Sequence, residues 1–154
     1  MSSSTPRKSE QRFPTISATD PVGDLVYAVF DISIPALPVL VLILNLEPIS
    51  AIGVKNALVF GWGTAVVGIA LFYGEWVTPP TRTEPGWLSL TPSLFGVRIL
   101  YYNVLLLVAG YCGGYIGSFS HSMYLSALVG ITISTIAISF FPWVVDHYWS
   151  SSSK

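Results

Sequence analysis

The chain has 154 residues, of which 52% are hydrophobic and only 10% are charged, and its mean hydropathy is +0.64. Soluble domains carry about 25% charged residues, so the composition argues against a water-soluble domain and favours a protein whose solvent is lipid. The net charge is −1 and the basic residues are scattered. This excludes an electrostatic nucleic-acid interface, and we expect no nucleic-acid partner.

The N-terminal segment is polar, and the first apolar run follows it. Residues 1–20 are rich in Ser, Thr and charged side chains, which predicts a disordered cytoplasmic tail. The first membrane-spanning helix is expected over about 25–46, because the second half of this run is apolar on every face. The polar residues Asn45 and Glu47, followed by Pro48, predict its end.

Three further apolar runs each exceed the roughly 20 residues that cross a bilayer core. The second helix is expected over about 54–77, where two successive prolines follow. The third and fourth are expected over about 94–117 and 123–149, and the short link between them predicts an antiparallel helical hairpin. Pro142 predicts a kink in the fourth helix, and residues 150–154 are expected to form a short cytoplasmic tail.

The distribution of Lys and Arg predicts the orientation in the membrane, because positively charged flanks resist translocation. With the N-terminus inside, the cytoplasmic basic residues are Arg7, Lys8, Arg12, Arg82, Arg98 and Lys154, and Lys55 is outside. Amphipathic aromatic residues gather at the same cytoplasmic boundary: Trp76, Trp87, Trp143, Tyr148 and Trp149. The sequence therefore predicts an all-α, multi-pass protein of the cell membrane. Residues 21–149 form its four-helix transmembrane bundle, and both termini are cytoplasmic.

Ionisable residues within the predicted helices are the candidates for a functional site. Asp31 and Arg98 enter from the same side at similar depths, and Glu75 lies nearer the surface. The structural interpretation is a neutralising ion pair, and the functional one is an entry site for a proton or a cation. Pro35 and Pro38 each remove a backbone donor close to Asp31, so a freed carbonyl is a further candidate ligand for a cation.

Small residues recur at spacings of three or four residues, which lets two helices approach closely. They are Gly110, Gly113, Gly114 and Gly117 in the third helix, Gly61, Ala65 and Gly68 in the second, and Ser126, Gly130, Ser134 and Ala137 in the fourth. One interpretation is packing within the bundle. The other is self-association or docking to a larger membrane partner.

The remaining reactive side chains indicate neither catalysis nor a cofactor. Cys112 is the only cysteine and is expected to be a small core residue. His121 and His147 fall on opposite sides of the predicted membrane, so they do not share a metal or a haem. The sequence has no Ser-His-acid order with a nucleophile elbow, no phosphate-binding loop and no H-E-x-x-H motif. We therefore expect a protein that is not an enzyme and has no catalytic, metal or cofactor site.

The predicted helices contain many small residues that suit helix packing and few ionisable side chains. The leading expectation is a non-enzymatic accessory or assembly subunit that lies in the lipid bilayer and packs against itself or a larger membrane complex. The alternative is a small ion or proton transporter or channel subunit that uses Asp31 and Arg98.

Overall fold

The protein is all-helical in the residues described by the computed structural model, which are 21–45, 52–74, 76–77 and 92–152. The helices are α1 (Pro21–Leu44), α2 (Ile52–Tyr73), α3 (Pro92–Ser120) and α4 (Met123–Ser152). Each helix is long and apolar enough to cross a membrane. The prediction of four such helices is therefore confirmed, whereas the predicted tail at 1–20 lies outside the described residues.

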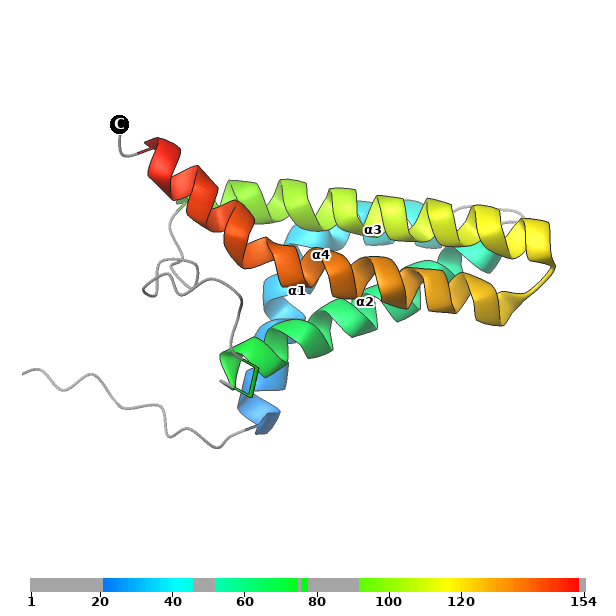
Figure 1. Ribbon diagram of the computed structural model, residues 1–154, viewed down its shortest axis with the longest axis horizontal. Helices are drawn as coiled ribbons and strands as arrows, with labels where there is room; N and C mark the ends of the chain where they lie inside the picture. Colours follow the sequence, from blue (N-terminus) through cyan, green and yellow to red (C-terminus); the bar gives the residue numbers. More distant parts are fainter. Residues whose placement is uncertain (1–20, 46–51, 75, 78–91, 153–154) are drawn as a thin grey trace, which may run out of the picture.

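The helices form a bundle with α1 on one side (Figure 1). α2, α3 and α4 all contact one another, and α1 packs against α2 and α3, behind α4 in the view of Figure 1. We call the end with the starts of α1 and α3 the termini end, and the opposite end the hairpin end. The helices converge at the hairpin end, and at the termini end α2 diverges from α4 (Figure 1).

Prolines open two of the helices earlier than predicted. α1 begins at Pro21 and α3 begins at Pro92, rather than near 25 and 94. Proline is favoured in the first helical turn, because its backbone nitrogen needs no hydrogen bond there and its φ is already helical. α1 ends at Leu44, two residues before the predicted boundary.

α2 is shorter than predicted, since it ends at Tyr73 instead of 77. The carbonyl of Leu71 accepts hydrogen bonds from the amides of Trp76 and Val77, at 3.0 and 3.3 Å, and these contacts replace the helical pattern. The Trp76 ring folds back over Gly74, where a Cβ atom would stand 2.4 Å from the indole. Glycine permits this close approach, so the helix stops before the two prolines are reached.

The link between α3 and α4 consists of only two residues, which confirms the antiparallel hairpin. α3 continues to Ser120, three residues beyond the prediction, and His121 adopts a left-handed conformation with φ of 51°. The Ser122 amide donates to the Gly117 carbonyl at 3.3 Å, which is the closing bond of a Schellman motif. The Ser122 hydroxyl then accepts a hydrogen bond from the Leu125 amide at 3.4 Å and caps α4.

α4 remains helical through Pro142 and ends at Ser152, so residues 150–152 belong to the helix and not to the predicted tail. The C-terminal part of α4 changes direction in Figure 1, as the proline predicts. On the preceding turn, the Tyr101 hydroxyl of α3 donates a hydrogen bond of 2.5 Å to the Ala137 carbonyl. This contact joins α3 to the bend.

The predicted small residues lie between the helices of this one chain. A Cβ atom on Gly130 would stand 2.3 Å from the Ala57 carbonyl oxygen, and one on Gly113 would stand 2.3 Å from the Ala57 side chain. A Cβ atom on Gly114 would meet Val54 at the same distance. α2, α3 and α4 therefore touch at backbone distance, and none of the small residues singled out in these helices is exposed.

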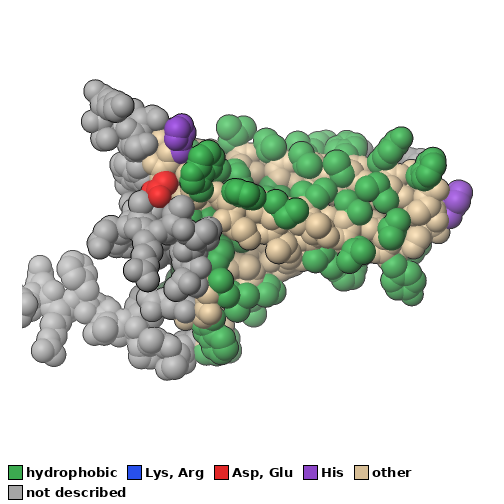
Figure 2. Space-filling view, viewed as in Figure 1, with side chains coloured by type: hydrophobic (Ala, Val, Ile, Leu, Met, Phe, Trp, Pro, Cys, Tyr) green, Lys and Arg blue, Asp and Glu red, His purple; other side chains and the backbone are tan. Residues whose placement is uncertain are grey.

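The outer surface of the bundle is apolar. Hydrophobic side chains cover the visible face between the two ends, and histidine and acidic side chains appear only at the ends (Figure 2). Cys112 belongs to this surface, so the prediction of a core position is wrong. In a helix that is apolar all round, hydrophobicity does not select the buried face. The neighbouring glycines, Gly113 and Gly114, occupy the buried face instead.

Candidate functional site

The structure brings Asp31 of α1 and Arg98 of α3 together inside the bundle. Arg98 Nη1 donates to Asp31 Oδ1 at 2.6 Å, and the side chains of Arg98 and Asp31 are only 4% and 13% exposed. Asp31 follows Pro21 by ten residues, which places it about 15 Å along α1 by the rise of 1.5 Å per residue. Glu75, the third candidate, lies outside the described residues.

Two tyrosines from different helices complete a polar cluster around this pair. Tyr73, the last residue of α2, lies within electrostatic range of the Asp31 carboxylate. Tyr102 lies one turn after Arg98 on the same face of α3 and is fully buried. Its hydroxyl is within electrostatic range of Asp31, Arg98 and Tyr73. We call Asp31, Tyr73, Arg98 and Tyr102 the polar cluster.

Beside the polar cluster, an asparagine of α3 is inserted into the backbone of α1. The Asn103 amide nitrogen donates to the Pro35 carbonyl at 2.7 Å, and its side-chain oxygen accepts from the Val39 amide at 3.1 Å. In an unbroken helix that carbonyl and that amide bond to each other. Asn103 thus bridges the break, and the two halves of α1 run in different directions (Figure 1).

A further polar contact attaches α1 to α2. The Trp62 indole nitrogen donates to the Ser33 hydroxyl at 3.1 Å, and both residues are partly buried. α1 is therefore held by specific polar contacts to its neighbours. α2, α3 and α4 are held by close glycine packing together with hydrogen bonds such as the one from Tyr101 to Ala137.

The chemistry available to the polar cluster follows from its charge balance. One guanidinium faces one carboxylate, so the pair is neutral overall and attracts neither a cation nor an anion strongly. The Pro35 carbonyl, which lies on the proline-broken stretch, already accepts from Asn103. That carbonyl is therefore not available to a cation, whereas the carbonyls that Pro35 and Pro38 leave without a helical donor are those of Asp31 and Ile34.

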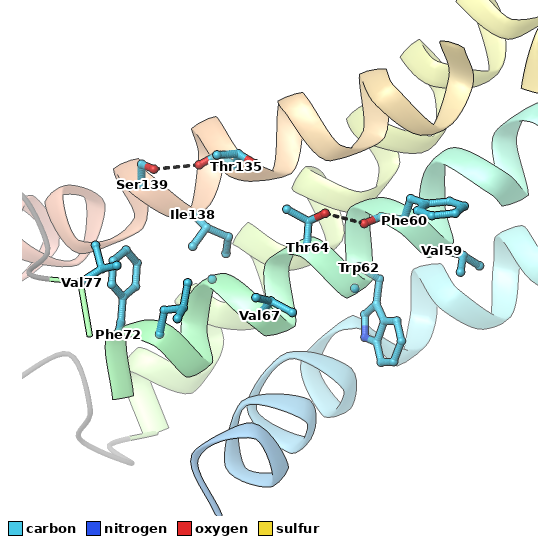
Figure 3. Close-up of a pocket in the computed structure, with 13 residues that line it drawn as sticks. Val59, Phe60, Trp62, Thr64, Val67, Phe72, Val77, Thr135, Ile138 and Ser139 are labelled. Atoms are coloured by element: carbon cyan, nitrogen blue, oxygen red, sulfur yellow. Dashed lines mark hydrogen bonds between the residues drawn. The ribbon is translucent and has the colours of Figure 1, made fainter. Parts of the chain in front are cut away.

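A cleft of about 740 Å³ opens between α2 and α4, on the side of the bundle opposite α1 (Figure 3). It is lined by Val59, Phe60, Trp62, Gly63, Thr64, Val67, Gly68, Leu71, Phe72 and Val77, and by Thr135, Ile138 and Ser139 of α4. The three hydroxyls in this lining donate to carbonyls of their own helices. The cleft is therefore apolar in effect and offers hydrocarbon contacts.

The two histidines lie at opposite ends of the bundle, as predicted: His121 between α3 and α4, and His147 near the end of α4 (Figure 2). His147 stacks on Trp143, with ring centroids 5.7 Å apart. Within the described residues, no three His, Cys, Asp or Glu side chains gather closely enough to hold a metal.

Sequence reasoning missed three of the residues that build this site. Tyr73 and Tyr102 resemble the other aromatic residues of apolar helices, so no feature of the sequence predicted that they belong to the polar cluster. Asn103 did carry a signal, because a lone carboxamide in a membrane helix usually bonds across to a neighbour. Its partner, a proline-broken backbone, was also recognisable from the sequence.

No curated protein and no solved structure matches this chain. A family model does match, over residues 19–148, and this range includes α1, α2 and α3 completely and nearly all of α4. The match covers the polar cluster, Asn103 and the cleft. The chain belongs to the family described as a domain of unknown function, DUF8215.

Proposed function

We propose that this protein is a multi-pass membrane protein with four spanning helices, and that both termini face the cytoplasm. The four apolar helices support insertion, and the excess of Lys and Arg at the termini end supports the orientation. The exposed aromatic residues Trp76 and Trp143 lie at that same end, where indole rings favour the headgroup level.

Cysteine labelling tests the orientation, because the chain has a single native cysteine that can be replaced. In a Cys112→Ser background, Ser120→Cys at the hairpin end should react in intact cells with a maleimide that does not cross membranes. Tyr148→Cys at the termini end should react only after permeabilisation. The opposite pattern would reverse the proposed orientation.

Within the membrane, we propose that the protein is a non-enzymatic accessory subunit that binds an apolar transmembrane helix of a partner. The observation that carries this proposal is the cleft between α2 and α4. Its lining follows α2 from Val59 to Phe72, which is about 20 Å of helix and suits another helix lying alongside. Gly63 in this lining has no other atom within 4 Å of an added Cβ, so a partner can approach the backbone there.

The glycines predicted to mediate packing in α3 and α4 do not support assembly, since they pack within the chain. The proposal therefore rests on the cleft. Self-association remains a second form of it, in which the partner helix comes from another copy.

Site-specific photocrosslinking tests this proposal in living cells. A photoreactive amino acid at Val67, which lines the cleft and is 53% exposed, should capture a discrete membrane polypeptide. The matched control is Leu100 of α3, which is 69% exposed and lies outside the cleft. A protein adduct at Val67 but not at Leu100 supports the proposal, and the absence of protein adducts at Val67 overturns it.

A second candidate function is transport of protons or small ions by an oligomer, with Asp31 and Arg98 in the path. The observation in its favour is the burial of a charged pair beside a broken helix, an arrangement found in transporters. Purified protein in liposomes should then conduct protons, sodium or potassium, and Asp31→Asn should abolish the flux. Flux equal to that of empty liposomes would eliminate this candidate.

A further inference from the structure

Tyr102 has a buried hydroxyl that no described residue satisfies. Its side chain is 0% exposed, and its ring packs against Phe141 and Tyr101 at centroid distances of 5.3 and 6.0 Å. The ring is therefore fixed, and the hydroxyl cannot turn toward solvent. Buried polar groups in native proteins almost always have a partner, so an orphaned one points to a bound water or ion.

The hydroxyl is directed toward the ion pair. Side chains in a helix lean toward its N-terminus, and Tyr102 follows Arg98 by one turn on the same face. The phenol therefore extends toward Arg98, and its oxygen is within the electrostatic reach of Asp31 and Arg98.

The polar cluster has the capacity to hold a water molecule. A carboxylate has about four acceptor positions, and Asp31 accepts from Arg98 at 2.6 Å. A buried water needs two to four polar partners. The Tyr102 hydroxyl can both donate and accept a hydrogen bond, and the Asp31 carboxylate supplies acceptors.

The other unsatisfied buried hydroxyl provides a contrast. Ser134 Oγ also lacks a partner, but it lies in the glycine contact between α2 and α4. A Cβ atom on Gly61 would stand 2.9 Å from Ser134 Oγ and 3.3 Å from the Gly130 carbonyl oxygen. This space is too tight for a water, so the same signature does not mark a site there.

From these observations we infer that the polar cluster binds a water molecule, which is hydrogen-bonded to the Tyr102 hydroxyl and to the Asp31–Arg98 pair. A cation is disfavoured because it would meet Arg98, and an anion because it would meet Asp31. A small neutral dipole satisfies both charges. This inference is independent of the proposed partner helix and of transport.

Conservative substitutions test the inference, because a hydroxyl that holds a water and an unsatisfied hydroxyl predict different changes in melting temperature. If the hydroxyl is an orphan, Tyr102→Phe removes an unsatisfied group and leaves the melting temperature unchanged or higher. If it holds the water, Tyr102→Phe should lower the melting temperature, by about 2–4 °C for a chain of this size. Tyr101→Phe is the matched control, since its hydroxyl has a direct bond to the Ala137 carbonyl.

A double-mutant cycle locates the water. Tyr102 and Asp31 couple through a shared water, so the effect of Tyr102→Phe should shrink to less than half in an Asp31→Asn background. The effect of Tyr101→Phe should be the same in both backgrounds. A high-resolution structure in lipid should show water density on the Tyr102 oxygen. A melting temperature that is unchanged or raised by Tyr102→Phe, or an empty density at that oxygen, would overturn the inference.

Discussion

Asp31 and Arg98, separated by 67 residues in the chain, meet at 2.6 Å inside the helical bundle. Both side chains are largely shielded from solvent, so each charge depends on the other. Removing one member of such a pair typically costs about 3–5 kcal/mol, whereas replacing both with apolar residues is often close to neutral. The pair therefore fixes the position of α1 without necessarily adding stability.

We expect Asp31→Leu to destabilise the protein strongly, by about 3 kcal/mol, because it leaves the Arg98 guanidinium without its counter-charge. Asp31→Leu combined with Arg98→Met should recover most of this loss. Unfolding in a denaturing detergent series measures both variants. A double variant that is no more stable than the single one would contradict this explanation.

Asn103→Leu should lower stability by about 2 kcal/mol, because it leaves the Pro35 carbonyl and the Val39 amide without partners while it preserves side-chain volume. The control is Asn45→Leu. Among the described residues, the Asn45 side chain donates only to the Val41 carbonyl of its own helix, at an exposed site. Its replacement should therefore change stability by less than about 0.5 kcal/mol. Equal effects at the two positions would show that the bridge contributes little.

Two glycines should respond to the same substitution in opposite directions. Gly130→Ala forces a Cβ atom against the Ala57 carbonyl and should cost about 1–3 kcal/mol. Gly63→Ala points into the open cleft and should stabilise α2 by about 0.5–1 kcal/mol, since alanine is the better helix former. Thermal unfolding of the two purified variants in one detergent decides the comparison.

His121→Gly should stabilise the hairpin by about 1 kcal/mol, because glycine adopts the left-handed conformation without the steric cost of a Cβ atom. The same replacement at His147 lies within α4 and should destabilise by about 0.5–1 kcal/mol. Melting temperatures that shift in the same direction for both variants would refute the assignment of strain to His121.

The number of helices was predictable because four apolar runs each reach the length that crosses a bilayer core. The helix ends were less predictable, since local contacts decide them. α2 stops where Trp76 folds over Gly74, and no propensity rule foresees that contact. α3 extends beyond Gly117 because His121 accepts a left-handed conformation usually given to glycine.

The polar cluster was predictable only in part, because the sequence does not show which face of each apolar helix is buried. The sequence identified Asp31 and Arg98 as candidates, because ionisable groups are rare within apolar helices. Hydrophobic periodicity did not identify the buried faces, and so Cys112 was assigned to the core although it is exposed. The positions of Tyr73 and Tyr102 depend on how three helices cross, which is information that one sequence does not contain.

α1 lies far from α3, its polar partner, along the sequence, and this has a consequence for biogenesis. Because chains are synthesised from the N-terminus, the helix with Asp31 leaves the ribosome well before Arg98 or Asn103 exists. The Asp31 carboxylate and the broken backbone of α1 therefore lack their partners until α3 has been synthesised. The packing of α1 against α3 is thus a late step of maturation, and slowed translation between the two helices would prolong the lifetime of a half-assembled protein.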